Sequence, residues 1–199
     1  MNALSRLLRP LDYMRIRHPE KLSYDFIIPA ILTALIVALL LLLPKPVQLS
    51  GKDGLFAAIV GLLQILTGFY IASLAAIATF KKEGMDQTMP GDPPTLKTSF
   101  RGKIRIDQLT RRRFLCLMFG YLAFVSVFLY FVGNGALLVS DNLKLVISAK
   151  LYPIVKWSCV TAYLFITSNL IITTLLGLYY MVDRIHRNEG SIEGGQDID

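Results

Sequence analysis

The sequence predicts an all-α integral membrane protein with four transmembrane helices and both termini in the cytoplasm. Three observations predict this fold class. Of the 199 residues, 54% are hydrophobic and only 18% are charged, against about 25% charged residues in a soluble domain. The apolar residues gather into long blocks instead of recurring at the period of a helix or strand. Lys and Arg concentrate in alternate segments between those blocks, as they do in multi-pass membrane proteins.

Each apolar block is long enough to cross a bilayer as a helix. The first block, residues 26–43, has no charge and reaches about 27 Å at 1.5 Å per residue. The second, residues 55–80, is longer than a bilayer requires and therefore has to tilt or protrude. The block interiors contain no Asp or Glu, which argues against a proton-coupled transporter. With their flanks, the predicted spans are 24–44, 55–80, 114–132 and 151–182.

The basic residues predict the orientation of these spans. Sixteen of the 21 Lys and Arg residues lie in the segments 1–23, 81–113 and 183–199, and four lie in 45–54 and 133–150. The basic segments 1–23, 81–113 and 183–199 are therefore predicted to be cytoplasmic. Arg111, Arg112 and Arg113, just before the third span, are predicted to face the anionic headgroups of the bilayer.

The segment before the first span is predicted to lie in the membrane interface. Leu4, Leu7, Leu8 and Leu11 recur at helical spacing with arginines between them, which is typical of an interfacial helix. Pro10 is expected to break this helix, because a proline removes a backbone hydrogen bond.

The central loop 81–113 is the only sizeable soluble part, and its second half has two interpretations. Residues from Phe100 to Asp107 alternate between apolar or small and charged. Such alternation predicts a strand with one basic face, which needs a partner strand from another chain or subunit. Alternatively, the segment continues into the third helix, with Asp107 or Thr110 near its start. The basic residues proposed to dock a partner are Arg101, Lys103, Arg105, Arg111, Arg112 and Arg113.

The remaining connections are predicted to be simpler. Segment 133–150 is amphipathic, with Asp141 as a helix cap, and Pro153 is expected to kink the start of the fourth helix. The tail 183–199 is predicted to begin as a helical extension and to be disordered where it becomes Gly-rich and acidic.

No catalytic or metal-binding pattern is present in the sequence. His18 and His186 are isolated from other ligand-type residues, so we predict no enzyme activity, no cofactor and no metal. Cys116 and Cys159 are interpreted as packing residues. Lys156, beside Trp157, is interpreted as an interfacial anchor, with a pore-lining cation as the alternative.

Small and polar residues on two predicted helices indicate helix packing. They form stripes in the second and fourth spans, where such residues let helices approach closely and hydrogen-bond. The faces either hold one four-helix bundle together or join copies in a homo-oligomer. The residues are Gln64, Gly68, Ala72, Ala76, Ser168 and Asn169.

Together with the basic central loop, this four-span topology and the closing stretch "NLIITTLLGLYYMVDRIHR" resemble the KwaA family, the membrane components of the bacterial Kiwa anti-phage defence system. The resemblance covers the whole chain in topology. It implies a bacterial inner-membrane protein that oligomerises, senses events at the envelope and works with a soluble DNA-binding partner, KwaB.

The sequence therefore favours a non-enzymatic membrane scaffold or sensor that docks a soluble cytosolic effector. The alternative is a small oligomeric pore or holin-like permeability protein, which the polar stripe of the fourth span suggests. Direct binding of nucleic acid is not favoured, because the basic loop lies close to anionic lipid headgroups.

Overall fold

The computed structural model describes residues 6–45, 47–51, 53–79, 85–88, 93–100 and 103–184. The prediction of four long apolar helices is confirmed. Within the described residues, four helical segments are long and apolar enough to cross a membrane, which indicates a multi-pass membrane protein. They are Ser23–Leu42, Leu55–Thr79, Arg111–Ser140 and Tyr152–Val182.

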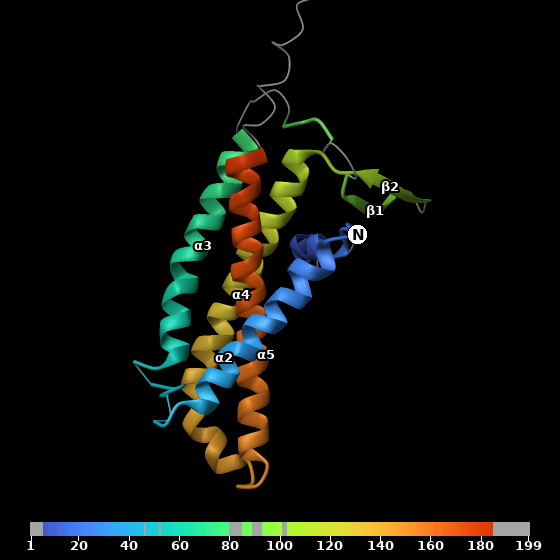
Figure 1. Ribbon diagram of the computed structural model, residues 1–199. Helices are drawn as coiled ribbons and strands as arrows, with labels where there is room; N and C mark the ends of the chain where they lie inside the picture. The colour runs from blue at the N-terminus through green and yellow to red at the C-terminus, as the bar shows by residue number, and fades with distance from the viewer. Residues whose placement is uncertain are drawn as a thin grey trace, which may run out of the picture.

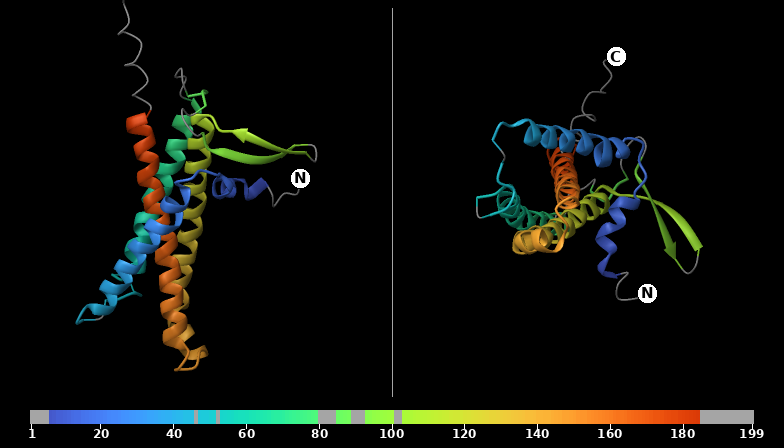
Figure 2. Two further views of the ribbon diagram at one scale, coloured as in Figure 1. Left: turned by 45° about the vertical axis from the view of Figure 1, so that its right-hand side comes forward. Right: turned by 90° about the horizontal axis from the view of Figure 1, so that it is seen from below.

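The helices pack in the spatial order α3, α4, α5, α2 (Figure 1). Helix α3 (Leu55–Thr79) lies along α4 (Arg111–Val146), which packs against α5 (Tyr152–Tyr179). Helix α2 (Ile28–Leu42) crosses α5 obliquely and diverges from the bundle toward its far end (Figure 2). The N-terminal segment (blue) and the C-terminal end of α5 (red) lie toward the same end of the bundle (Figure 1).

Two further helical elements, η1 and η2, lead into α2. The 3-10 helix η1 (Arg9–Arg15) begins with Pro10 in its first turn, where a proline needs no amide hydrogen bond. Arg6 and Leu7 are α-helical and the chain turns at Leu8 before η1 begins, so the helix expected here is short and broken just before Pro10. Helix η1 packs against α4, and its Tyr13 is buried. A π-helical turn, η2 (Ser23–Ile27), then leads into α2.

A strand is present within the predicted segment, but it begins at Lys103, Phe100 belongs to a second strand, and the two strands pair within the same chain. Strand β1 (Thr95–Phe100) pairs with β2 (Lys103–Gln108) in an antiparallel hairpin, in which Leu96 lies opposite Asp107. The predicted partnership with another chain is therefore wrong, because β1, whose sequence signal is weak, supplies the partner strand. Of the two interpretations of this segment, the strand is therefore correct. The hairpin projects sideways from the end of the bundle (Figure 2).

Helix α4 is much longer than the predicted third span. It begins at Arg111 and runs for 36 residues. Residues 133–146 therefore continue this helix instead of forming a separate outer segment. Asp141 therefore lies inside α4 and caps no new helix. Pro153 occupies the first turn of α5, a position that prolines tolerate without kinking a helix. The described part of the C-terminal tail is a helical extension, η3 (Tyr180–Arg184).

Polar bonds between helices accompany the apolar core. Thr67 Oγ1 on α3 lies 2.8 Å from Ser126 Oγ on α4, and Tyr70 on α3 lies 2.6 Å from Thr174 Oγ1 on α5. Thr33 Oγ1 on α2 donates to the backbone oxygen of Pro29 and lies 3.2 Å from Ser168 Oγ on α5. Interhelical bonds of this kind contribute on average about 0.6 kcal/mol in a membrane.

Gly133 provides a test of how closely α4 approaches its neighbours. A Cβ at this position would lie 2.5 Å from the Tyr163 hydroxyl and 2.6 Å from Val60 Cγ2. Gly133→Ala is therefore expected to destabilise the protein by about 1–3 kcal/mol through overpacking. The matched variant Gly120→Ala, also on α4, meets no atom within 4 Å and should be neutral or stabilising by helix propensity. Unfolding of both variants in detergent measures the difference, and equal stabilities would contradict the close packing.

Candidate functional site

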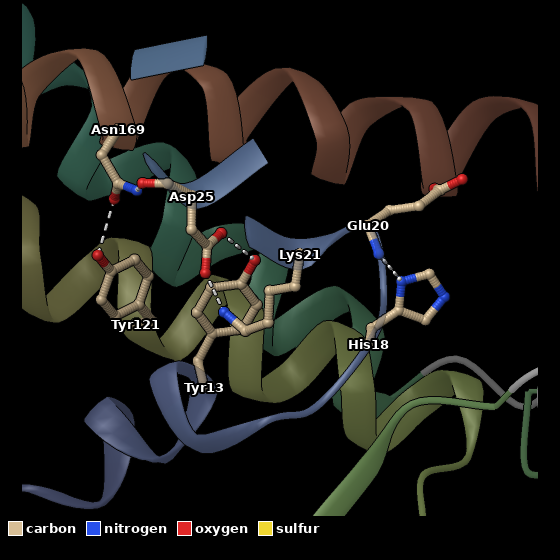
Figure 3. A network of polar contacts seen from close by, with 7 residues as sticks. All are labelled: Tyr13, His18, Glu20, Lys21, Asp25, Tyr121 and Asn169. Atoms are coloured by element: carbon tan, nitrogen blue, oxygen red, sulfur yellow. Dashed lines mark hydrogen bonds and ion pairs between the residues drawn. The ribbon is translucent and has the colours of Figure 1, made fainter. Parts of the chain in front are cut away.

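A buried carboxylate organises the hairpin end of the bundle. Asp25, in the π-helical turn η2, is only 2% exposed. Its side chain pairs with the ammonium of Lys21, one turn earlier, and accepts a hydrogen bond of 3.3 Å from the Tyr13 hydroxyl. The Lys21 ammonium also lies 4.1 Å from the centroid of the Tyr13 ring. We call Tyr13, Lys21, Asp25, Tyr121 and Asn169 the Asp25 cluster (Figure 3).

Asn169 connects this cluster to two other helices. From α5, its amide nitrogen donates to the backbone oxygen of Asp25 at 2.8 Å, and its oxygen accepts from the Tyr121 hydroxyl on α4 at 2.8 Å. The bond to Asp25 has a local cause. Pro29 has no N–H to offer to the carbonyl four residues before it, and its ring crowds that carbonyl in a regular helix. The wider π-helical turn relieves the crowding, and Asn169 supplies a donor.

Tyr13 is held in place by aromatic packing. Its ring stacks on Tyr121 with 4.9 Å between centroids and lies 6.5 Å from the ring of Phe114. Burial, together with the nearby charge of Asp25, raises the pKa of the Tyr13 phenol well above its usual value. The hydroxyl therefore stays protonated at neutral pH and remains a donor to the carboxylate.

The chain between η1 and η2 joins the Asp25 cluster to the hairpin. Ile16, three residues after Tyr13, is also buried. The next residue, Arg17, exchanges two backbone hydrogen bonds with Thr95 of β1, at 2.9 and 3.2 Å. A cavity of about 500 Å³ lies at this junction. Its lining includes Arg17, Lys21, Asp25 and Thr95, so the paired charges border the space beneath the hairpin.

His18 and Glu20 flank the same junction. The backbone N–H of Glu20 donates to His18 Nδ1 at 3.3 Å (Figure 3). The backbone N–H of Lys21 donates to the His18 oxygen at 3.2 Å. His18 therefore shapes the chain where it turns into η2. Among the described residues, no group of three or more His, Cys, Asp or Glu side chains is placed to hold a metal ion.

The predicted docking residues divide into surface and packed positions. Arg105 is 80% exposed and lies 3.2 Å from Asp107, which Arg113 also approaches at 3.7 Å. Arg111, by contrast, is only 7% exposed, so it does not face headgroups as the sequence suggested. Arg101 lies outside the described residues. For Lys103 only the backbone position is described, and it lies at the start of β2.

Arg112 anchors the segment before the hairpin to the bundle. Its guanidinium makes two bonds to the Asp86 carboxylate, at 2.8 and 3.1 Å, and a third to the backbone oxygen of Ile77 near the end of α3 at 3.0 Å. This pairing lowers the pKa of Asp86 below its usual value, so the bridge persists at neutral pH. Arg112 is therefore committed to an intramolecular contact.

The predicted packing residues also divide into two groups. Ser168 and Asn169 are buried between helices of the same chain. The α3 residues Gln64, Gly68, Ala72 and Ala76 are all exposed, and the core side of α3 is formed by other side chains such as Leu63 and Tyr70. The small-residue face of α3 therefore lies on the outside of this chain.

The sequence reasoning missed Asp25. The interiors of the apolar blocks contain no Asp or Glu, but the first helical span starts at Ser23, and its first turn includes this buried carboxylate. The apolar block starts at Phe26, directly after Asp25, so hydropathy assigned this residue no role. The spacing of Lys21 and Asp25, four residues apart in a helix, was the available signal.

No protein-family model, curated protein or solved structure matches the chain. The function therefore has to be argued from the geometry of the site.

The Lys21–Asp25 pair can be tested by a double-mutant cycle. Lys21→Met leaves a buried carboxylate without its counter-charge and should cost about 3 kcal/mol of unfolding free energy. Asp25→Asn should cost less, because the partly exposed Lys21 ammonium can reach water. The double variant should cost less than the sum of the two single variants. Unfolding in detergent measures all three, and strictly additive losses would show that the pair does not interact.

Proposed function

We propose that the chain is a multi-pass membrane scaffold or sensor that docks a soluble effector through its β-hairpin and has no enzymatic activity of its own. The observation that carries the proposal is the hairpin, which projects away from the helices while its base is tied to the buried Asp25 cluster (Figures 2 and 3). A projecting element with such an attachment can bind a partner and pass a displacement to the bundle.

The hairpin has the features of a docking element. In the described part of the chain its sheet has two strands, and a two-stranded hairpin alone is marginally stable. Ile106 on β2 is 63% exposed, on the strand face opposite to that of Arg105. Ile106 thus offers apolar contact on one face, Arg105 offers positive charge on the other, and a partner strand could extend the sheet.

The base of the hairpin supports a sensing role. The backbone bonds between Arg17 and Thr95 join β1 to the segment that carries Tyr13 and Lys21. Movement of the hairpin would therefore act directly on a buried ion pair, which tolerates few arrangements. This connection favours transmission between the partner and the helices over a purely passive anchor.

Self-association is the second part of the proposal. Gln64 is exposed near the middle of α3, where an amide facing lipid would lack hydrogen-bond partners. A second copy packed on the face formed by Gln64, Gly68, Ala72 and Ala76 would bury the amide and use the small residues for close approach. The proposed assembly is therefore a homo-oligomer.

The resemblance to the KwaA family agrees with this proposal and would place the protein in the bacterial inner membrane, with the hairpin and termini in the cytoplasm and KwaB as the effector. Anti-phage defence would then be its biological role. The pore alternative has less support, because Ser168 and Asn169 of the polar stripe are buried between helices of one chain.

Charge reversal on the basic face of the hairpin tests the docking proposal. The paired substitution Lys103→Glu and Arg105→Glu should remove at least about nine-tenths of a stoichiometric soluble partner that co-purifies in mild detergent. Lys97→Glu is the matched control, because Lys97 is exposed on the other face of the same hairpin. Mass spectrometry measures the partner, and membrane insertion must be equal in all variants. Retained partner in the charge-reversed protein would exclude this face.

The oligomer is tested separately by particle mass. Gly68→Leu should shift the purified protein toward the monomer, because a bulky side chain prevents close helix approach. Ala78→Leu provides the control, since Ala78 is exposed on α3 but lies off the small-residue face. A particle mass that Gly68→Leu leaves unchanged would exclude this face as the interface.

A further inference from the structure

A second cavity lies at the end of the bundle opposite the hairpin. It has a volume of about 410 Å³, within the usual range of small-molecule pockets. It is bordered by the start of α3, the second half of α4 and the first half of α5. Phe56 and Tyr163, whose rings stack with 4.8 Å between centroids, form one aromatic wall.

Small residues on α4 keep this cavity open. At Gly133 there is no room for a Cβ between α4 and the side chains of Tyr163 on α5 and Val60 on α3, so the three helices pack closely there. Gly135, half a turn further on, lines the cavity, and a Cβ added there would meet no atom within 4 Å. Ala136 also lines it. The extension of α4 beyond the predicted third span thus builds a pocket, not a separate surface segment.

One cation lines this otherwise mainly apolar pocket. Lys156 is half-buried, no acidic side chain is among the lining residues, and the ion pairs of the described residues do not include it. The nearby Tyr163 hydroxyl already donates to the backbone oxygen of Leu129 at 3.4 Å. An ammonium beside apolar walls is costly unless an anion accompanies it.

We propose that this pocket binds an anionic amphiphile with an alkyl chain. Its carboxylate or phosphate head would pair with the Lys156 ammonium, and its chain would lie against Phe56, Val132 and Val160. A free fatty acid and an anionic phospholipid share this chemistry. The pocket is distinct from the Asp25 cluster, and the inference does not depend on the docking role of the hairpin.

Equilibrium binding of radiolabelled oleate to the full chain in phosphatidylcholine nanodiscs tests the proposal, with empty nanodiscs as the partition control. Lys156→Gln should weaken oleate binding roughly tenfold or more, as expected for the loss of a charge-assisted hydrogen bond. Lys150→Gln is the matched charge control, because Lys150 is exposed at the same end of the bundle. Oleyl alcohol, which lacks the charge, should bind the unaltered protein as weakly as oleate binds the Lys156→Gln variant.

A second pair of variants tests the location. Gly135→Leu fills the cavity and should reduce oleate binding at least about tenfold, whereas Gly120→Leu, placed in open space elsewhere on α4, should not change it. Cys159 is exposed and lines the pocket, so bound oleate should slow its alkylation. Cys116, half-buried outside this pocket, is the internal reference.

The source of the ligand is read from the same assay. Protection of Cys159 by phosphatidylglycerol in the nanodisc, without oleate, identifies a phospholipid, and protection by oleate alone identifies a fatty acid. Equal binding of oleate and oleyl alcohol, unchanged oleate binding by Lys156→Gln, or unprotected Cys159 under both lipids would overturn the proposal.

Discussion

A carboxylate buried at the end of an apolar helix bundle has to be neutralised where it lies, and this requirement shapes the N-terminal third of the molecule. Asp25 is paired by Lys21 from its own helix and by the Tyr13 hydroxyl from η1. For Tyr13 to reach it, the chain before η2 folds back against α4. The stacking of Tyr13 on Tyr121 then fixes that segment, and Asn169 joins the same point to α5.

The position of the hairpin follows from this arrangement. Two strands alone bury too little surface to be stable, and the hairpin is attached to the bundle mainly through its base. Leu96 and Leu109 are buried there, Arg17 extends the ladder of β1, and Arg113 approaches Asp107 from the first turn of α4. The exposed part of the hairpin therefore has a firm support although its own strands are short.

The sequence predicted the features that depend on one helix or strand at a time. Four spans and the strand around Ile104–Ile106 were predictable from runs of apolar residues and from alternation. The pairing of that strand with Thr95–Phe100 was not, because β1 carries only Leu96 and Phe100 as apolar residues. Arg111 and Arg112 were read as surface charges, since sequence spacing does not show that Asp86 and the end of α3 meet Arg112. Asp25 was missed because its burial depends on contacts with Tyr13 in η1 and Asn169 in α5, which hydropathy does not show.

The boundary after the third apolar block was also misread, for an instructive reason. Gly133, Asn134 and Gly135 follow that block directly, yet the helix continues through them to Val146. Helix α4, at 1.5 Å per residue, is about 54 Å long, far longer than a hydrocarbon core of roughly 30 Å. The hairpin is attached at its first turn, and the Lys156 pocket lies against its second half. A single rigid rod therefore joins the two regions, and a tilt of that rod about the middle of the membrane would carry its ends in opposite directions, as in a lever.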